Sequence, residues 1–280
     1  MSDAREVLVY VDPSPRGLWA LDTAGLLPER ERLSFHLLAT EEDLAEHPDL
    51  LARARQRFSG LAAVRESSRP GPAERAVVLE ARERAYDMVV VPPAGRNAIQ
   101  RMLKGSRVAT VVRSLRAPVL VARRPPLRFQ RILAAVSGGR ASERVVALAA
   151  ELAAGLGAAA DYLHVFAEVA LPFSPHDEPV APVHQASEAV DAARALAAAH
   201  SAPLIVREGL VADEVIEAFE TGAYDLLVVG ASAESERGRR GREDVTERIL
   251  LGCPGCTLVV PASGLRRTLP EPALTRDDRE

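Results

Sequence analysis

The feature that most constrains the fold is a strand-like segment that occurs twice. Ala85–Val91 reads AYDMVVV, and Ala223–Val229, 138 residues later, reads AYDLLVV. The same spacing relates Pro118–Val121 to Cys256–Val259. A repeat at the scale of a whole domain predicts two similar domains. Two domains also suit a chain of 280 residues, because a single hydrophobic core rarely grows large enough for a chain of that length.

Each half alternates short apolar runs with helical patterns, which predicts crossover units and a parallel sheet. We therefore expect an α/β fold of two tandem Rossmann-like domains, each a five-stranded parallel sheet flanked by helices. The predicted strands are 7–11, 33–40, 62–66, 88–91 and 119–122, then 132–136, 161–169, 204–208, 226–229 and 257–260. The predicted helices are 16–27, 41–58 with a break at Pro48, 72–85 and 106–115, then 142–155, 187–199, 213–221 and 244–251.

A charged, proline-rich segment, Arg123–Pro126, separates the two halves, because proline breaks both helix and sheet. We expect a first domain over 1–125 and a second over 128–264. The polar, proline-containing tail 265–280 is predicted to be disordered. The last strand of each half is a short apolar segment that would be exposed at the edge of its sheet.

Composition and charge exclude several classes of function. Residues 1–126 carry 20 basic and 16 acidic residues, a net +4, while residues 127–280 carry 15 and 23, a net −8. Neither half has the basic excess of a nucleic-acid binder. No apolar run reaches the roughly 18 residues that span a bilayer. The first ten residues also lack the basic-then-apolar order of a secretory signal. We expect a cytoplasmic protein with neither a nucleic acid nor a membrane as partner.

The candidate site lies where the first-half strands end, since ligands of an open parallel sheet bind at the carboxyl ends of strands near the reversal of strand order. The loops after Val11 and Val91 meet there. Gly105 and Ser106 begin a predicted helix. A glycine lets a phosphate approach the backbone, a serine can cap the helix, and the helix start presents free N–H groups. Lys104, the only lysine of the chain, adds a full positive charge beside them.

This pattern resembles the universal stress protein family, whose ATP-binding members carry Gly-x2-Gly-x9-Gly-Ser/Thr after the fourth strand and an aspartate after the first. Gly95-x9-Gly105-Ser106 fits, and Asp12 lies in VDPSP, which is similar to the family's VDGSP. The resemblance covers nearly the whole chain twice and implies a tandem member with adenine nucleotide alpha hydrolase-like domains. It implies that Asp12 contacts adenine, with Leu37 as a further backbone contact, and that the glycines and the serine hold ribose and phosphates.

Both halves depart from the family pattern. In the first half Pro92 replaces the first glycine, which removes an N–H donor and fixes φ. The second half keeps Gly230 there, but has Ala233 at the second glycine, Glu243-Asp244 in place of Gly-Ser, and Ser137 in place of the first-strand aspartate. Two carboxylates would repel a triphosphate by about 1–4 kcal/mol. We expect the second half to have lost the ATP site.

The resemblance implies a stress-response regulator that binds ATP or a related nucleotide in its first half, rather than an enzyme with turnover. The alternative is an interaction or scaffold module in which both sites are relics. In the family, the last strands pair antiparallel across a dimer. The strands 119–122 and 257–260 can do this within one chain, giving an intramolecular pseudo-dimer that leaves room for a further homodimer.

Three other motifs have two interpretations each. Ser137–Ser142 reads SGGRAS and resembles the SGGxDS phosphate loop of ATP pyrophosphatases, but it also fits a tight strand-to-helix turn. Cys253–Cys256 is a CxxC that could serve redox or metal chemistry, or place one cysteine in a turn and one in a strand. The basic loop Arg237–Arg242 fits an anion site or a solvated loop. His176 and His184 do not have the spacing of a usual metal site.

Overall fold

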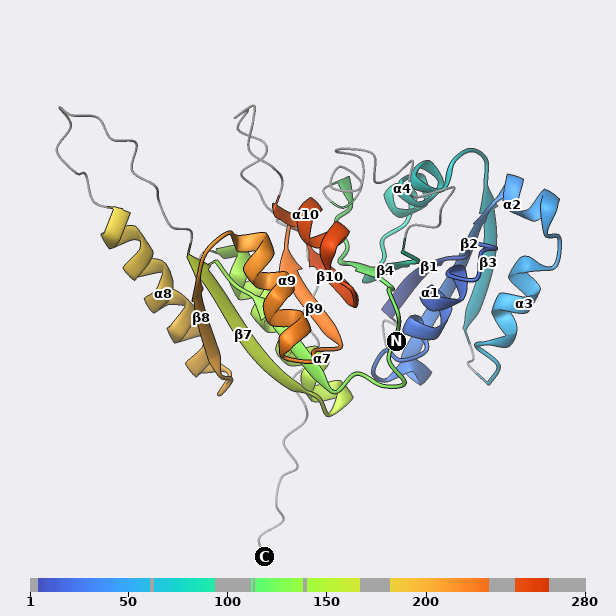
Figure 1. Cartoon of the computed structure of the whole chain (residues 1–280). Helices are drawn as coiled ribbons and strands as arrows, with labels where there is room; N and C mark the ends of the chain where they lie inside the picture. Colours follow the sequence, from blue (N-terminus) through green and yellow to red (C-terminus); the bar gives the residue numbers. More distant parts are fainter. Residues whose placement is uncertain are drawn as a thin grey trace, which may run out of the picture.

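A computed structural model of the chain describes residues 5–60, 63–93, 112, 114–137, 140–166, 182–231 and 245–261. Ten strands form one sheet in the order β3-β2-β1-β4-β5-β10-β9-β6-β7-β8 (Figure 1). The first five strands in that order come from the first half of the chain and the last five from the second half. Both halves therefore have the α/β architecture expected from the sequence.

Strands and helices alternate along the first half. Its elements are β1 (Arg5–Tyr10), α1 (Gly17–Ala24), a 3-10 turn (Arg30–Arg32), β2 (Leu33–Thr40), α2 (Glu41–Glu46), α3 (Leu50–Gln56), β3 (Val64–Arg69), α4 (Ala73–Glu83), β4 (Met88–Val91) and β5 (Val119–Val121). The predicted break at Pro48 is confirmed, because it separates α2 from α3.

The second half follows the same order. Its elements are β6 (Arg131–Ala135), α7 (Arg140–Leu156), β7 (Ala159–Phe166), α8 (Pro182–Ala199), β8 (Leu204–Glu208), α9 (Val211–Thr221), β9 (Leu226–Gly230), α10 (Val245–Gly252) and β10 (Cys256–Val260). α8 begins five residues earlier than predicted, at Pro182. Proline suits the first position of a helix, where its missing N–H has no intrahelical acceptor.

Every neighbouring pair of strands within a half is parallel, as predicted. The two halves meet at β5 and β10, which pair antiparallel with Leu120 opposite Leu258. This pairing gives each of the two short strands a second neighbour and leaves β3 and β8 at the sheet edges. It also points the strands of the two halves in opposite directions.

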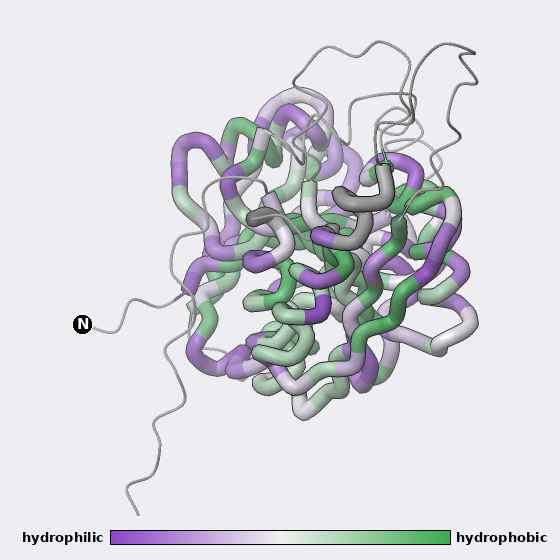
Figure 2. The backbone as a smooth tube through the Cα atoms, turned by 90° about the vertical axis from the view of Figure 1, so that its left-hand side faces the viewer, coloured by the Kyte–Doolittle hydropathy of each residue, from purple (hydrophilic) through white to green (hydrophobic). Residues whose placement is uncertain are grey.

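Apolar side chains pack on both faces of the sheet, and each layer runs across both halves. One layer lies under α1, α3, α7 and α8, and the other under α4, α9 and α10. Leu120 and Leu258 belong to the first layer, so the join between the halves is itself part of the core. Figure 2 shows the hydrophilic segments mainly around the outside of this core. None of the described helices is long and apolar enough to cross a membrane.

Candidate functional site

The end of β1 and the end of β4 are neighbours at the carboxyl edge of the first half. Val9 of β1 lies opposite Leu37 of β2 on one side and Val90 of β4 on the other. Three residues further along, Asp12 is therefore level with Thr40 and Pro93. The structure places Asp12 at the edge where a parallel sheet receives its ligands.

A tight turn fixes the Asp12 side chain. Its Oδ1 accepts a hydrogen bond from the Ser14 N–H at 2.7 Å. The backbone then enters α1 at Gly17, where a Cβ atom would lie 1.8 Å from the Asp12 carbonyl oxygen. Only glycine can occupy that position without moving the turn. Among the described residues, Asp12 Oδ2 has no hydrogen-bond partner, and the buried Ser14 hydroxyl has none either.

Leu37 lies in the interior of β2, three residues before its end, and its side chain is fully buried. It pairs with Val9 of β1 and with Glu66 of β3. At about 3.3 Å per strand residue, this places Leu37 about 10 Å along the sheet from the level of Asp12. The structure does not bring these two predicted adenine contacts together, so the role of Leu37 stays a prediction.

The other predicted ligands, Gly95, Lys104, Gly105 and Ser106, lie outside the described residues. The same holds for Ala233, Glu243-Asp244 and the loop 237–242 in the second half, for His176, and for the tail beyond residue 261. Within the described part of the chain, no group of three or more His, Cys, Asp or Glu side chains could hold a metal ion.

The two halves differ at the end of the strand that leads to the glycine motif. β4 ends at Val91, directly before Pro92, whereas β9 continues through Gly230, which pairs with Val260 of β10. Gly230 stands where the first half has Pro92. Beyond Gly230, the Ala231 N–H donates to the Val260 carbonyl oxygen at 2.7 Å, and Pro93, at the corresponding position of the first half, has no N–H to do so. The effect of Pro92 on nucleotide binding stays a prediction.

The end of β2 carries a hydrogen-bonded cluster that we did not predict from the sequence. Thr40 caps α2 by accepting the Asp43 N–H at 3.1 Å, and its hydroxyl donates to Asp43 Oδ2 at 2.6 Å. The Tyr10 hydroxyl donates to the same carboxylate oxygen at 3.0 Å. Burial, followed by the nearby Asp43 charge, raises the pKa of Tyr10. The cluster fixes the start of α2 beside the level of Asp12.

In the second half, Ser142 closes the turn after β6. Its buried hydroxyl oxygen accepts the Ser137 N–H at 2.8 Å and lies 3.2 Å from the Ser137 hydroxyl oxygen. The two serine side chains of the SGGRAS segment are therefore engaged with each other. This geometry favours the structural interpretation of the motif as a strand-to-helix turn. Gly138 and Gly139 lie outside the described residues.

The two cysteines are free thiols, both buried. Cys253 follows α10, and Cys256 is the first residue of β10. Burial raises the pKa of Cys253, and it raises the pKa of Cys256 to about 11. A reactive cysteine needs a lowered pKa and access to solvent. The surroundings of both thiols thus favour the interpretation as a turn cysteine and a strand cysteine.

Arg123 connects the first half to the end of α10 in the second half. Its guanidinium donates to the carbonyl oxygens of Leu250 (3.0 Å), Leu251 (3.3 Å) and Cys253. The first two carbonyls belong to the last turn of α10, which lacks internal donors, and Cys253 directly follows the helix. Burial lowers the pKa of Arg123. The arginine caps a helix across the join, a role that the sequence pattern did not reveal.

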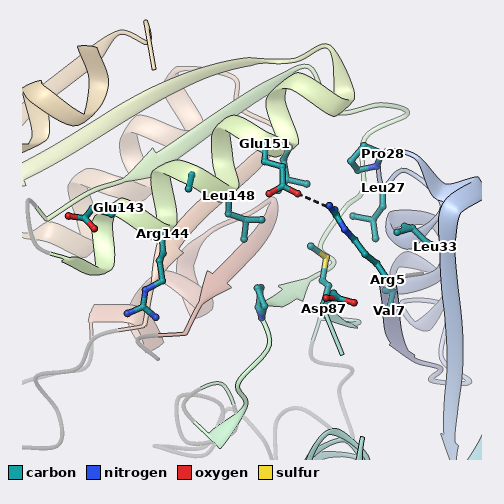
Figure 3. A pocket seen from close by; sticks show the side chains of 14 residues that line it. Arg5, Val7, Leu27, Pro28, Leu33, Asp87, Glu143, Arg144, Leu148 and Glu151 are labelled. Atoms are coloured by element: carbon teal, nitrogen blue, oxygen red, sulfur yellow. Dashed lines mark hydrogen bonds and ion pairs between the residues drawn. The ribbon is translucent and has the colours of Figure 1, made fainter. Parts of the chain in front are cut away.

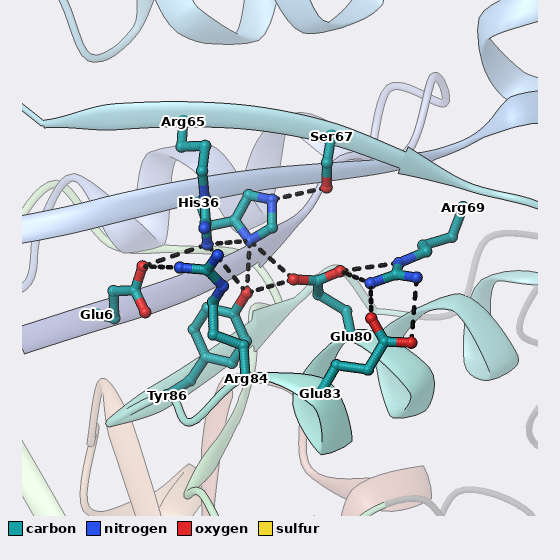
Figure 4. A network of polar contacts seen from close by, with 9 residues as sticks. All are labelled: Glu6, His36, Arg65, Ser67, Arg69, Glu80, Glu83, Arg84 and Tyr86. Carbon is teal, nitrogen blue, oxygen red and sulfur yellow. Dashed lines mark hydrogen bonds and ion pairs between the residues drawn. The ribbon is translucent and has the colours of Figure 1, made fainter.

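A second polar network is buried between β2, β3 and α4 (Figure 4). A guanidinium nitrogen of Arg65 lies 2.8 Å from His36 Nδ1, and the Ser67 hydroxyl oxygen lies 2.7 Å from Nε2. The Tyr86 hydroxyl oxygen lies 2.5 Å from Nδ1 and donates to Glu80 Oε1 at 2.8 Å.

This network sets the protonation of its members. Burial, with the Arg65 charge as the next cause, lowers the pKa of His36 to about 4. For Glu80, burial raises the pKa, but hydrogen bonds from Tyr86 and Arg69 outweigh it and leave the pKa below its ordinary value. The buried ring is therefore neutral and the buried carboxylate is charged at neutral pH. Arg69, which lies 2.7 Å from Glu80, compensates that charge.

Comparison with known proteins agrees with the fold. No curated protein shows a significant match. A putative universal stress protein from Pseudomonas aeruginosa UCBPP-PA14 is 18% identical over 92% of this chain and 94% of that chain, with a TM-score of 0.67. A universal stress protein from Archaeoglobus fulgidus DSM 4304 is 14% identical over 92% and 96%, with a TM-score of 0.65. A universal stress protein solved in complex with cAMP matches 42% of this chain and 95% of its own, at 24% identity and a TM-score of 0.35.

The family assignment rests on the sequence. The universal stress protein family model matches residues 2–123 and, a second time, residues 128–261. The two matches together cover most of the chain, one in each half of the ten-stranded sheet. The chain belongs to the universal stress protein family and is of the tandem type.

Proposed function

We propose that this chain is a cytoplasmic stress-response regulator that binds an adenine nucleotide, with ATP as the first candidate, at the carboxyl edge of its first half. It acts through binding rather than turnover. The observation that carries the proposal is the Asp12 turn, in which Oδ1 is held by the Ser14 N–H and Oδ2 stays available at the edge of the sheet. A carboxylate oxygen in that place can accept the exocyclic amino group of adenine.

A second polar atom beside Asp12 supports the same location. The Ser14 hydroxyl is buried and has no hydrogen-bond partner among the described residues. Buried polar atoms nearly always have a partner, and a ligand is one way to supply it. The second half has no counterpart to this arrangement, because Ser137 takes the place of the aspartate and is bonded to Ser142.

The antiparallel pairing of β5 with β10 supports a further part of the proposal. We propose that this join reproduces, within one chain, the dimer in which the last strands of two family members pair. The tandem chain then contains one binding half and one half that serves as its built-in partner.

Calorimetric titration of the full chain with ATP tests the nucleotide site. Asp12→Asn is the sharpest variant, because an asparagine oxygen keeps the turn with Ser14 while its amide replaces the free acceptor by a donor. We expect one ATP per chain, bound at least about tenfold more weakly by Asp12→Asn. Ser137→Ala, the matched change in the second half, should bind like the unchanged chain.

Gly105→Asp provides an independent check, since it introduces a carboxylate at the position that Glu243 holds in the second half. Repulsion of the phosphates should abolish binding. Pro92→Gly should leave binding intact or strengthen it, because it restores the N–H that the second half keeps at Gly230. The alternative function is an interaction module without a nucleotide. It would be supported if the unchanged chain gave no binding heat at millimolar ATP and Gly105→Asp gave the same calorimetric trace.

A further inference from the structure

A cavity of about 360 Å³ lies between the two halves, away from the nucleotide site (Figure 3). From the first half, its wall comes from residues at the starts of strands, among them Val7 of β1, Leu33 of β2 and Met88 of β4. It therefore lies at the amino ends of these strands, whereas Asp12 lies beyond their carboxyl ends. The opposite wall is a single face of α7, including Ala147 and Leu148.

Two contacts across the join border this cavity. Arg5 of β1 and Glu151 of α7 form an ion pair at 3.1 Å, which Figure 3 shows at the wall of the cavity. Further along α7, Gly155 packs directly against Pro28, so that a Cβ atom on Gly155 would lie 2.7 Å from the proline Cβ. The cavity is thus built from both halves and exists because the second half is attached.

The chemistry of the wall defines what can enter. Nine of the fourteen lining residues are apolar and the other five are charged. The charged groups that are not exposed already have partners. Arg5 pairs with Glu151, Asp87 Oδ2 accepts the Glu6 N–H at 2.8 Å, and Arg144 donates to the Pro261 carbonyl oxygen at 3.3 Å. The wall therefore offers mainly apolar surface, in which the Arg5 and Glu151 charges neutralise each other and Asp87 and Arg144 are engaged with backbone groups.

We propose that this cavity is a binding site for a compact, uncharged and mainly apolar small molecule. Its volume lies in the range of about 300–1,000 Å³ that is typical of small-molecule sites. Its mainly apolar wall favours an apolar ligand, because binding removes apolar surface of both from water. A mainly apolar ligand matches most of this wall, whereas a charged ligand group would lose its hydration against apolar side chains. The site is distinct from the nucleotide site in both place and chemistry, and does not depend on it.

The test uses N-phenyl-1-naphthylamine, an uncharged apolar probe whose fluorescence rises when it leaves water. Titration into the full chain should show saturable binding of one molecule per chain. Ala147→Trp fills the cavity from α7 and should weaken binding at least about tenfold. Ala195→Trp is the matched control, because Ala195 is exposed on α8 and does not line the cavity. It should bind the probe like the unchanged chain.

Ala147→Leu adds less volume and keeps the test valid if the tryptophan variant does not fold. Its affinity for the probe should be weaker than that of the unchanged chain without being lost completely. Unsaturable binding, or equal affinity in the unchanged chain and in both Ala147 variants, would overturn the proposal. An equal loss of probe affinity in Ala195→Trp and Ala147→Trp would also overturn the proposal, because such a result would place the probe outside the cavity.

Discussion

Acidification should destabilise the chain through His36, and the size of the effect follows from its pKa. In the folded chain the pKa is about 4, because burial and Arg65 oppose the charged ring, while the ordinary value is 6.5. Between these two values the unfolded chain binds one more proton than the folded chain. The stabilisation that the neutral His36 ring contributes is therefore fully present above about pH 6.5 and is lost as the pH falls towards 4.

The magnitude can be worked out from these two pKa values. A full shift of this size corresponds to about 3 kcal/mol, of which about 1 kcal/mol is lost between pH 7.5 and pH 5.5. The interval from pH 7.5 to pH 5.5 is the useful one to measure, because few carboxylates titrate in it. Glu80, whose pKa lies below its ordinary value, adds a further loss only at lower pH.

Urea unfolding followed by circular dichroism at pH 7.5 and pH 5.5 measures this effect. In His36→Gln the loss over this interval should be smaller by about 1 kcal/mol. Ser67→Ala removes a hydrogen-bond partner of the ring but no titratable group, so it should lower stability at both pH values and keep the pH dependence. If His36→Gln loses as much stability as the unchanged chain, the buried neutral histidine is not the source.

Three further predictions concern the join and the thiols. Arg123→Met should destabilise the chain by about 2 kcal/mol, measured by chemical unfolding, because the last carbonyls of α10 lose their donors; an unchanged midpoint would contradict the capping role. Cys253 and Cys256 should resist iodoacetamide at pH 8 until the chain unfolds, because both are buried and their pKa values are raised, to about 11 for Cys256; rapid labelling of the folded chain would refute this. Gly155→Val should lower the thermal midpoint, because its side chain would meet Pro28, and an unchanged midpoint would show that the contact can give way.

The architecture could be predicted from the sequence because the signals that set it are local. The apolar run 33–40 is β2 to the residue, and Pro48 divides α2 from α3. β3 was predicted at 62–66 and runs over Val64–Arg69 instead. Its sequence, VRESSR, has little apolar character, because the strand lies at the edge of the sheet and only its pairing with β2 defines it.

The polar networks could not be predicted, since their members are far apart in the chain. His36, Arg65, Glu80 and Tyr86 come from β2, β3, α4 and the segment before β4. No spacing links them, and only the packed structure brings them together. Asp12 is the opposite case, because the end of an apolar strand and a following turn are visible in the sequence itself.

The antiparallel join decides how the two halves can influence each other. Because β5 and β10 run in opposite directions, the carboxyl edges of the two halves lie at opposite sides of the sheet. A single nucleotide therefore cannot contact both edges. The same geometry places the start of α7, which follows the carboxyl end of β6, on the side of the amino ends of the first-half strands, where it forms a wall of the cavity. Any effect of a nucleotide at Asp12 on the second half must pass through the core across the join and through contacts such as Arg123 with α10 and Arg5 with Glu151.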